Sequence, residues 1–205
     1  VLQHLFNVIY DSKAALREAA SEALAANLKL ISEREYTDEH LRQALTQLDV
    51  GFSQLTVEKS HGAMLILDVL LTIPPPHELS NTMRNMQRDF QDICWEVLQR
   101  KEHRDKSVRQ KVLDLIPKMA AFLPKTFLSP NRFTQPNNFL TVSILHLLQL
   151  IRQGNERQLA YHSLGKLFLA MASVLTKFRA LIDDIVAAVR QGFNNPFCTE
   201  ALTCL

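Results

Sequence analysis

His103, Arg104 and Asp105 spell the triplet that opens the catalytic loop of protein kinases, in which the aspartate accepts the proton of the substrate hydroxyl. The rest of that signature is absent. Lys106 stands where leucine should follow, Gln110 stands where asparagine is needed, and no glycine-rich phosphate loop precedes the triplet. We therefore predict that this triplet is a helix-capping turn without a catalytic role.

Metal ligands and nucleophiles also lack the spacing that chemistry requires. The seven histidines form no His-Glu-x-x-His pair. Cys198 and Cys204 fall on different faces of a helix, and with Cys94 they make an odd number that suits a reducing compartment. Asp183 and Asp184 are expected on solvated helix surface. The sequence therefore predicts no catalytic, cofactor-binding or metal-binding residue, and no cofactor.

Composition excludes several classes of protein. The 205 residues are 47% hydrophobic and 21% charged with only five glycines, which indicates a globular, helix-rich chain. The net charge of +2, with both signs interspersed, gives no reason to expect nucleic acid. The most basic stretch, residues 100–111, could receive an acidic segment, but it is better explained as a solvated turn because no aromatic residues interleave. The longest apolar run, residues 139–151, is shorter than the roughly 20 residues of a membrane span.

Apolar periodicity predicts helices separated by turns and no strands. Pro74, Pro75 and Pro76 should end one helix, and residues 124–138 form the most loop-like segment. Leu55 is placed on an apolar helix face, with a break expected at residues 58–60. Both ends of the chain look cut from something longer. The expected helices cover residues 1–10, 12–31, 37–57, 61–73, 79–100, 105–123, 139–152, 156–176 and 178–193, with a last helix starting at residues 194–196.

One helical pattern recurs four times at intervals of 43, 49 and 48 residues. It consists of a small or β-branched anchor residue followed four positions later by Leu or Ile. The pairs are Ala20/Leu24, Ala63/Leu67, Val112/Ile116 and Ala160/Leu164. Three residues before the anchor stand Arg17, Arg109 and Arg157, with Ser60 in the second repeat. Helix pairs with this period and this arginine are typical of HEAT repeats.

The repeats predict an all-α fold, an α-solenoid of about four to five HEAT helix pairs in a right-handed superhelix. Residues 1–205 should form a single array, because one helix pair cannot bury both its apolar faces alone. Each arginine is expected to bond a carboxylate or turn carbonyls of the adjoining repeat, and Pro117 should bend its helix. The expected repeats are approximately residues 1–35, 37–74, 79–123, 137–176 and 178–205.

Four blocks of sequence resemble the N-terminal HEAT region of the TOR (target of rapamycin) serine/threonine kinases. They are residues 11–20, 60–67, 115–122 and 157–165. The first block is generic, whereas HGAxLxL, LxPxxAAF and RxxAxxxLG are specific in combination. The chain departs from the family after Ile73, where relatives often carry a long insert and only PPPHELSNT stands here.

The resemblance implies a non-catalytic scaffold and protein-interaction segment, with the kinase domain outside this chain. The expected partners are a raptor-like subunit and a second TOR protomer, with no nucleic acid, membrane span or small-molecule substrate. The implied location is the cytoplasm, with lysosomal or vacuolar association through the full complex. The alternative is a HEAT-repeat transport receptor or phosphatase-scaffold-type protein, although such receptors usually have acidic inner faces that the net charge does not indicate. A third hypothesis, phosphorylation by the chain itself, requires ATP binding.

Overall fold

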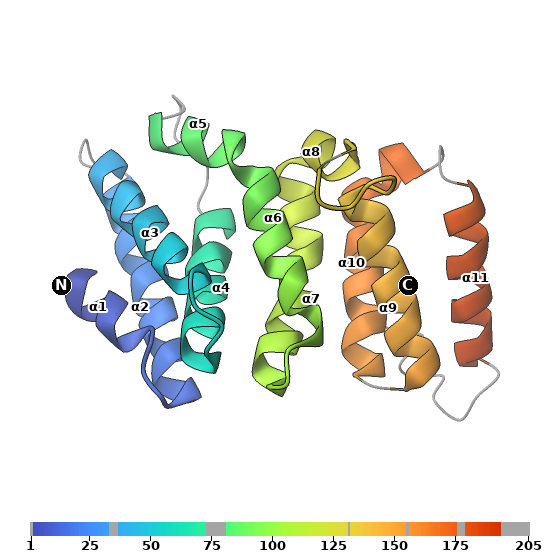
Figure 1. The fold of residues 1–205 in the computed structure, drawn as a ribbon, viewed down its shortest axis with the longest axis horizontal. Helices are drawn as coiled ribbons and strands as arrows, with labels where there is room; N and C mark the ends of the chain where they lie inside the picture. Colours follow the sequence, from blue (N-terminus) through green and yellow to red (C-terminus); the bar gives the residue numbers. More distant parts are fainter. Residues whose placement is uncertain are drawn as a thin grey trace. The chain divides into compact units, whose positions relative to one another are not determined.

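A computed structural model describes residues 2–32, 37–72, 81–130, 132–154, 156–175 and 179–193. Their regular structure is helical, apart from an isolated β-bridge between Pro130 and Asn138 (Figure 1). The predicted all-α solenoid class is confirmed, since successive helices pair with their neighbours along the chain. In these ranges no helix is both long enough and apolar enough to span a bilayer. The helix expected from residue 194 lies outside the described residues, and so do Cys198 and Cys204.

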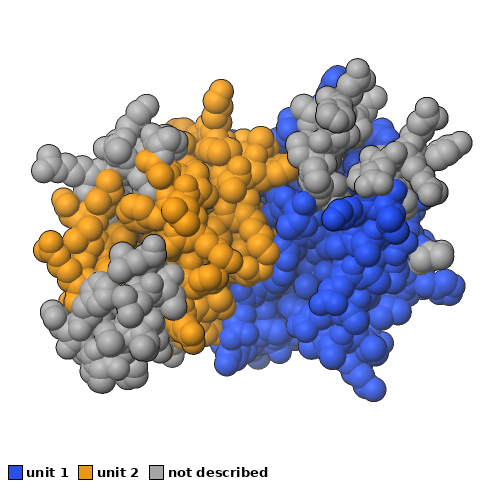
Figure 2. Space-filling model, turned by 180° about the vertical axis from the view of Figure 1, so that it is seen from behind, with its two compact units in different colours: residues 1–111 blue, residues 112–205 orange. Residues whose placement is uncertain are grey.

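The first of two compact units covers residues 1–111 (Figure 2). Its core is α4, in which the residues from Ser60 to Leu67 are all buried, so that neighbouring helices pack on most of its sides. Helices α2 and α3 both pack against α4. The elements are α1 (Leu2–Val8), α2 (Ala14–Ser32), α3 (Thr37–Phe52), α4 (Val57–Thr72), α5 (Asn81–Arg88), α6 (Phe90–Gln99), η1 (Arg100–Glu102) and the start of α7 (Lys106–Phe122).

The second unit covers residues 112–205 and contains the rest of α7 with α8 (Pro124–Leu128), α9 (Phe139–Gln153), α10 (Arg157–Leu175) and α11 (Arg179–Phe193). Helix α9 packs against α10 and α11 and is largely buried, as its apolar sequence predicts. The Asn138 side chain caps its first turn by accepting the Thr141 N–H at 2.9 Å. Gly154, with φ of 80°, ends it in the left-handed conformation that favours glycine.

The anchor pairs predicted from the repeat pattern all face the interior. Each of the eight side chains is at most 4% exposed, so one row of each second helix is packed as the register predicts. Helix α7 continues through Pro117, and a bend there stays a prediction. The repeat boundaries also stay a prediction.

Three predicted boundaries are wrong. Helix α3 ends at Phe52 and α4 begins at Val57, so the break precedes residues 58–60 and leaves Leu55 74% exposed. Ser53 ends α3 by donating its hydroxyl to the Val50 carbonyl at 2.8 Å. The loop predicted at residues 124–138 begins with the short α8, because a proline at the first helical position removes an N–H that has no helical partner.

The single helix predicted over residues 79–100 is also wrong, because it breaks at Asp89 into α5 and α6. The two helices make different contacts. Thr82 in α5 donates its N–H and hydroxyl to Asp38 in the first turn of α3, at 3.3 and 3.4 Å. Helix α6 instead buries Phe90 and the apolar residues that follow it.

Candidate functional site

The kinase-like triplet forms the turn before α7. The Asp105 carboxylate accepts the Ser107 N–H at 2.8 Å, the Ser107 hydroxyl, and the Val108 N–H at 3.4 Å. The side-chain bond from Ser107, followed by these backbone bonds, lowers the pKa of Asp105 below its usual range. The carboxylate therefore caps α7, and the predicted helix-capping turn is confirmed.

Arg17, Arg109 and Arg157 share one geometry. Each guanidinium reaches back to the carbonyl six residues earlier, and Arg17 and Arg109 also bond the carbonyl five residues earlier. The bonds are Arg17 Nη1 to Asp11 O (2.7 Å) and Ser12 O (3.0 Å), Arg109 Nη1 to His103 O (2.8 Å) and Arg104 O (2.8 Å), and Arg157 Nε to Ile151 O (3.2 Å). Each arginine thus closes the turn of its own helix pair.

The turn carbonyls that these bonds reach belong to the arginine's own helix pair, whereas turn carbonyls of the adjoining repeat were expected. The side chain of a residue in the first helical turn points back toward the helix N-terminus. The nearest acceptors are therefore the carbonyls of the turn that leads into the same helix, which no helical N–H bonds.

Arg17 also reaches a neighbouring pair, through His61 in α4. Its Nε donates to His61 Nδ1 at 3.1 Å, and both side chains are buried. Burial and the positive charges of Arg17 and Lys111 lower the pKa of His61 to about 4. The imidazole is therefore neutral at physiological pH and can accept the bond, where a carboxylate or carbonyl was expected.

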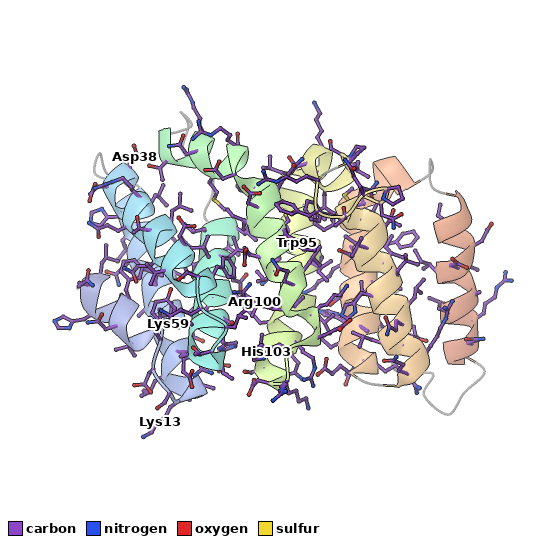
Figure 3. All side chains as sticks on the ribbon, viewed as in Figure 1. Lys13, Asp38, Lys59, Trp95, Arg100 and His103 are labelled. Atoms are coloured by element: carbon purple, nitrogen blue, oxygen red, sulfur yellow. The ribbon has the colours of Figure 1, made fainter. Side chains whose placement is uncertain are left out.

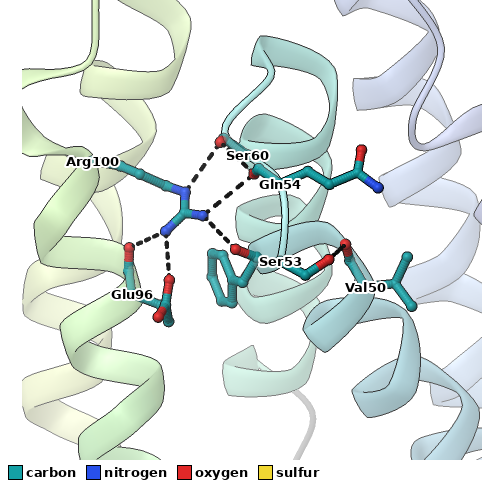
Figure 4. Close-up of polar contacts among 7 residues, drawn as sticks. Val50, Ser53, Gln54, Ser60, Glu96 and Arg100 are labelled. Carbon is teal, nitrogen blue, oxygen red and sulfur yellow. Dashed lines mark hydrogen bonds and ion pairs between the residues drawn. The ribbon is translucent and has the colours of Figure 1, made fainter.

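The second repeat has Ser60 in place of the arginine, and Arg100 supplies the missing guanidinium from the end of α6 (Figure 4). Arg100 donates from Nε to Ser60 Oγ at 3.1 Å and from Nη2 to the Phe52 carbonyl at 2.8 Å and the Gln54 carbonyl at 3.5 Å. Gln54 lies six residues before Ser60, the same offset as in the other repeats. A cation of another helix thus replaces the one missing from the sequence pattern.

Arg100, which is labelled in Figure 3, is 2% exposed, as Arg17 is, and it has several partners. Its Nη1 pairs with the Glu96 carboxylate at 2.9 Å, and its guanidinium lies 4.7 Å from the centre of the Phe52 ring. His103 Nε2 lies 3.4 Å from the Leu55 carbonyl, five residues before Ser60. Arg100 and His103 therefore both bond carbonyls of the turn between α3 and α4 and hold it in place.

Sequence reasoning missed Arg100, because the prediction placed it in a solvated basic turn over residues 100–111. That prediction is wrong for Arg100, which is buried. The available signal was the absence of arginine at Ser60 in an otherwise regular pattern. Asp183 and Asp184 are exposed, as predicted.

Comparison with known proteins relates nearly the whole chain to TOR kinases. It is 26% identical over 198 residues to serine/threonine-protein kinase tor1 of Schizosaccharomyces pombe, covering 93% of this chain and 8% of the relative. It is 29% identical to serine/threonine-protein kinase TOR of Oryza sativa subsp. japonica over 201 residues, and 29% identical to that of Arabidopsis thaliana over 199 residues. Each of these two alignments covers 95% of this chain and 7% of the Oryza or Arabidopsis protein. No family model and no solved structure matches the chain.

The chain is therefore homologous to one segment of the TOR serine/threonine kinases, and the resemblance predicted from its motifs is confirmed. It spans less than a tenth of the length of these relatives. The triplet His103–Asp105 is thus a helix-capping turn and not a kinase catalytic loop, because Lys106 and Gln110 depart from that signature and the aspartate caps α7.

Proposed function

We propose that this chain is a non-catalytic scaffold and protein-interaction segment of a TOR kinase, supporting the assembly of TOR complexes in nutrient and growth signalling. Its partners are a raptor-like subunit and a second TOR protomer. The observation that carries this proposal is homology to TOR kinases over 93–95% of the chain.

The geometry supports a structural function. Buried polar side chains such as Arg17 and Arg100 hold turns and neighbouring helices together. Arrays of helix pairs present extended surfaces, and their outer side chains are available for partners. On this proposal the segment acts in the cytoplasm and reaches endomembranes only through the full complex.

The proposal is tested by pull-down of purified raptor, and of a second tagged TOR chain, with this 205-residue chain. Circular dichroism establishes first that the chain is folded. Capture of either protein is expected. If the folded chain captures neither protein, the proposal is contradicted. Capture of Ran or Phe-Gly peptides instead would favour the transport-receptor alternative.

An ATP hydrolysis assay tests the absence of catalysis. The chain should show no activity above buffer, and Asp105→Ala should change nothing in that assay because the carboxylate caps α7. Hydrolysis by the chain that disappears in Asp105→Ala would contradict the proposed scaffold function.

A further inference from the structure

A groove of about 440 Å³ lies between α3 on one side and α5 and α6 on the other, within residues 1–111. Its floor is apolar and is formed by residues of three helices. The floor residues are Leu45, Phe52, Met86 and Ile93. Phe52, Met86 and Ile93 are each less than 9% exposed, so they belong to the packed core and give the groove a fixed base.

The rim of this groove is acidic. Among the described residues that line the groove there is no lysine, arginine or histidine, whereas four are carboxylates: Asp49, Asp89, Asp92 and Glu96. Asp49 lines the groove from α3. Partial burial of its carboxyl, and then the negative charge of Asp89 on the opposite wall, raise the pKa of Asp49. Arg88 lies 3.5 Å from Asp89 on exposed surface, and Arg100 bonds Glu96. The four carboxylates outnumber these two arginines, so the charge around the groove is negative in a chain whose net charge is +2.

Two features described above create this groove. The break at Asp89 separates α5 from α6 and brings Asp89 and Asp92 to the wall opposite α3. Arg100 joins the end of α6 to the Phe52 carbonyl at the end of α3. The two walls are thus connected at one end by a buried hydrogen bond.

We propose that this groove binds a segment of a partner protein in which lysine or arginine side chains flank an apolar side chain. The apolar floor supplies a dry contact for the apolar side chain, and the carboxylates of both walls pair with the cations and set their register. The volume lies in the range of pockets that bury a drug-sized ligand, so the groove has room for side chains of a short peptide segment. This inference rests on the proposed function as a protein-interaction scaffold and assigns a partner chemistry to one of its surfaces.

Fluorescence anisotropy of a labelled peptide, GRKLLRKG, titrated with the 205-residue chain tests the inference. The site variant is Asp49→Asn with Asp89→Asn. The matched control is Asp183→Asn with Asp184→Asn, which removes the same charge from exposed residues of α11. We expect the wild type and the control to bind equally and the site variant to bind about tenfold more weakly, with affinity falling as salt rises.

Three results would overturn the inference: no binding by the folded wild type, equal affinity for the wild type and the site variant, or equal losses in the two double variants. Equal binding of a charge-reversed peptide, GEELLEEG, would also overturn it. Raptor pull-down with the same three proteins separates the two proposals. Peptide binding without capture of raptor or a second TOR chain contradicts the scaffold alone, and capture without peptide binding contradicts the groove alone.

Discussion

Replacing Arg100 with alanine should destabilise residues 1–111 more than any change at an exposed cation of the same basic stretch. The substitution removes the donor to the buried Phe52 carbonyl. It also removes the N–H that Ser60 Oγ accepts, although this hydroxyl still donates to the Gln54 carbonyl at 3.5 Å. Each unsatisfied buried group costs roughly 1–3 kcal/mol. The Glu96 side chain is 38% exposed, so water can rehydrate its carboxylate and its loss of a partner adds little. We expect a loss of about 2–5 kcal/mol in the free energy of unfolding.

Urea unfolding followed by tryptophan fluorescence measures this loss. Trp95 is the chain's single tryptophan and lies in α6, so its emission reports on the unit that contains Arg100. Arg104→Ala is the matched control, because Arg104 is exposed and its backbone carbonyl, which Arg109 bonds, is unchanged. The control should change stability by about 0.5 kcal/mol or less. Equal midpoints for the two variants would refute the assignment of Arg100 as the donor that replaces the missing repeat arginine.

Three further changes test the packing and the buried polar groups. Ile116→Ala should cost about 2–5 kcal/mol in circular-dichroism unfolding, because a fully buried anchor is truncated, and a neutral result would mean that the repeat register is wrong. Gly62→Ala should cost about 1–3 kcal/mol, because the added Cβ would lie 2.4 Å from the Ile9 carbonyl oxygen; an unchanged urea midpoint would show that the turn after α1 does not approach α4 so closely. His61 is neutral when folded, with a pKa of about 4 against 6.5 unfolded, so the unfolded state binds more protons between these values and stability should fall as pH falls from about 6.5 to 4. His61→Gln should flatten this part of the urea-midpoint profile, and an equally steep profile would contradict a buried neutral imidazole.

Local sequence predicted the parts of the fold that depend on periodicity. The anchor pairs from Ala20/Leu24 to Ala160/Leu164 are buried because a 3.6-residue period places one row of side chains on a packed face. The Asp105 cap was also predictable, since the accepting carboxylate and the donor N–H groups lie within three residues of each other.

Features that join distant segments were not predictable in the same way. The sequence predicts Arg100 as a surface charge in a basic stretch. Its burial depends on bonds to the carbonyls of Phe52 and Gln54, which lie about fifty residues away in the chain. The acidic groove combines Asp49 with Asp89, which only the packing of α3 against α5 brings together. The break at Asp89 likewise has no proline or glycine in the sequence to mark it.

The donation from Arg100 also has a consequence for the order in which the chain folds during synthesis. In an ideal repeat array each helix pair completes its own turn, so pairs can fold one after another as they leave the ribosome. Here the turn between α3 and α4 receives its buried donor only when residue 100 has emerged, some forty residues after Ser60. Helices α3 to α6 should therefore reach their final stability in one cooperative step. A nascent chain whose residues up to a point between 72 and 99 have left the ribosome should stay more sensitive to protease in this region than one whose residues beyond 111 have left it.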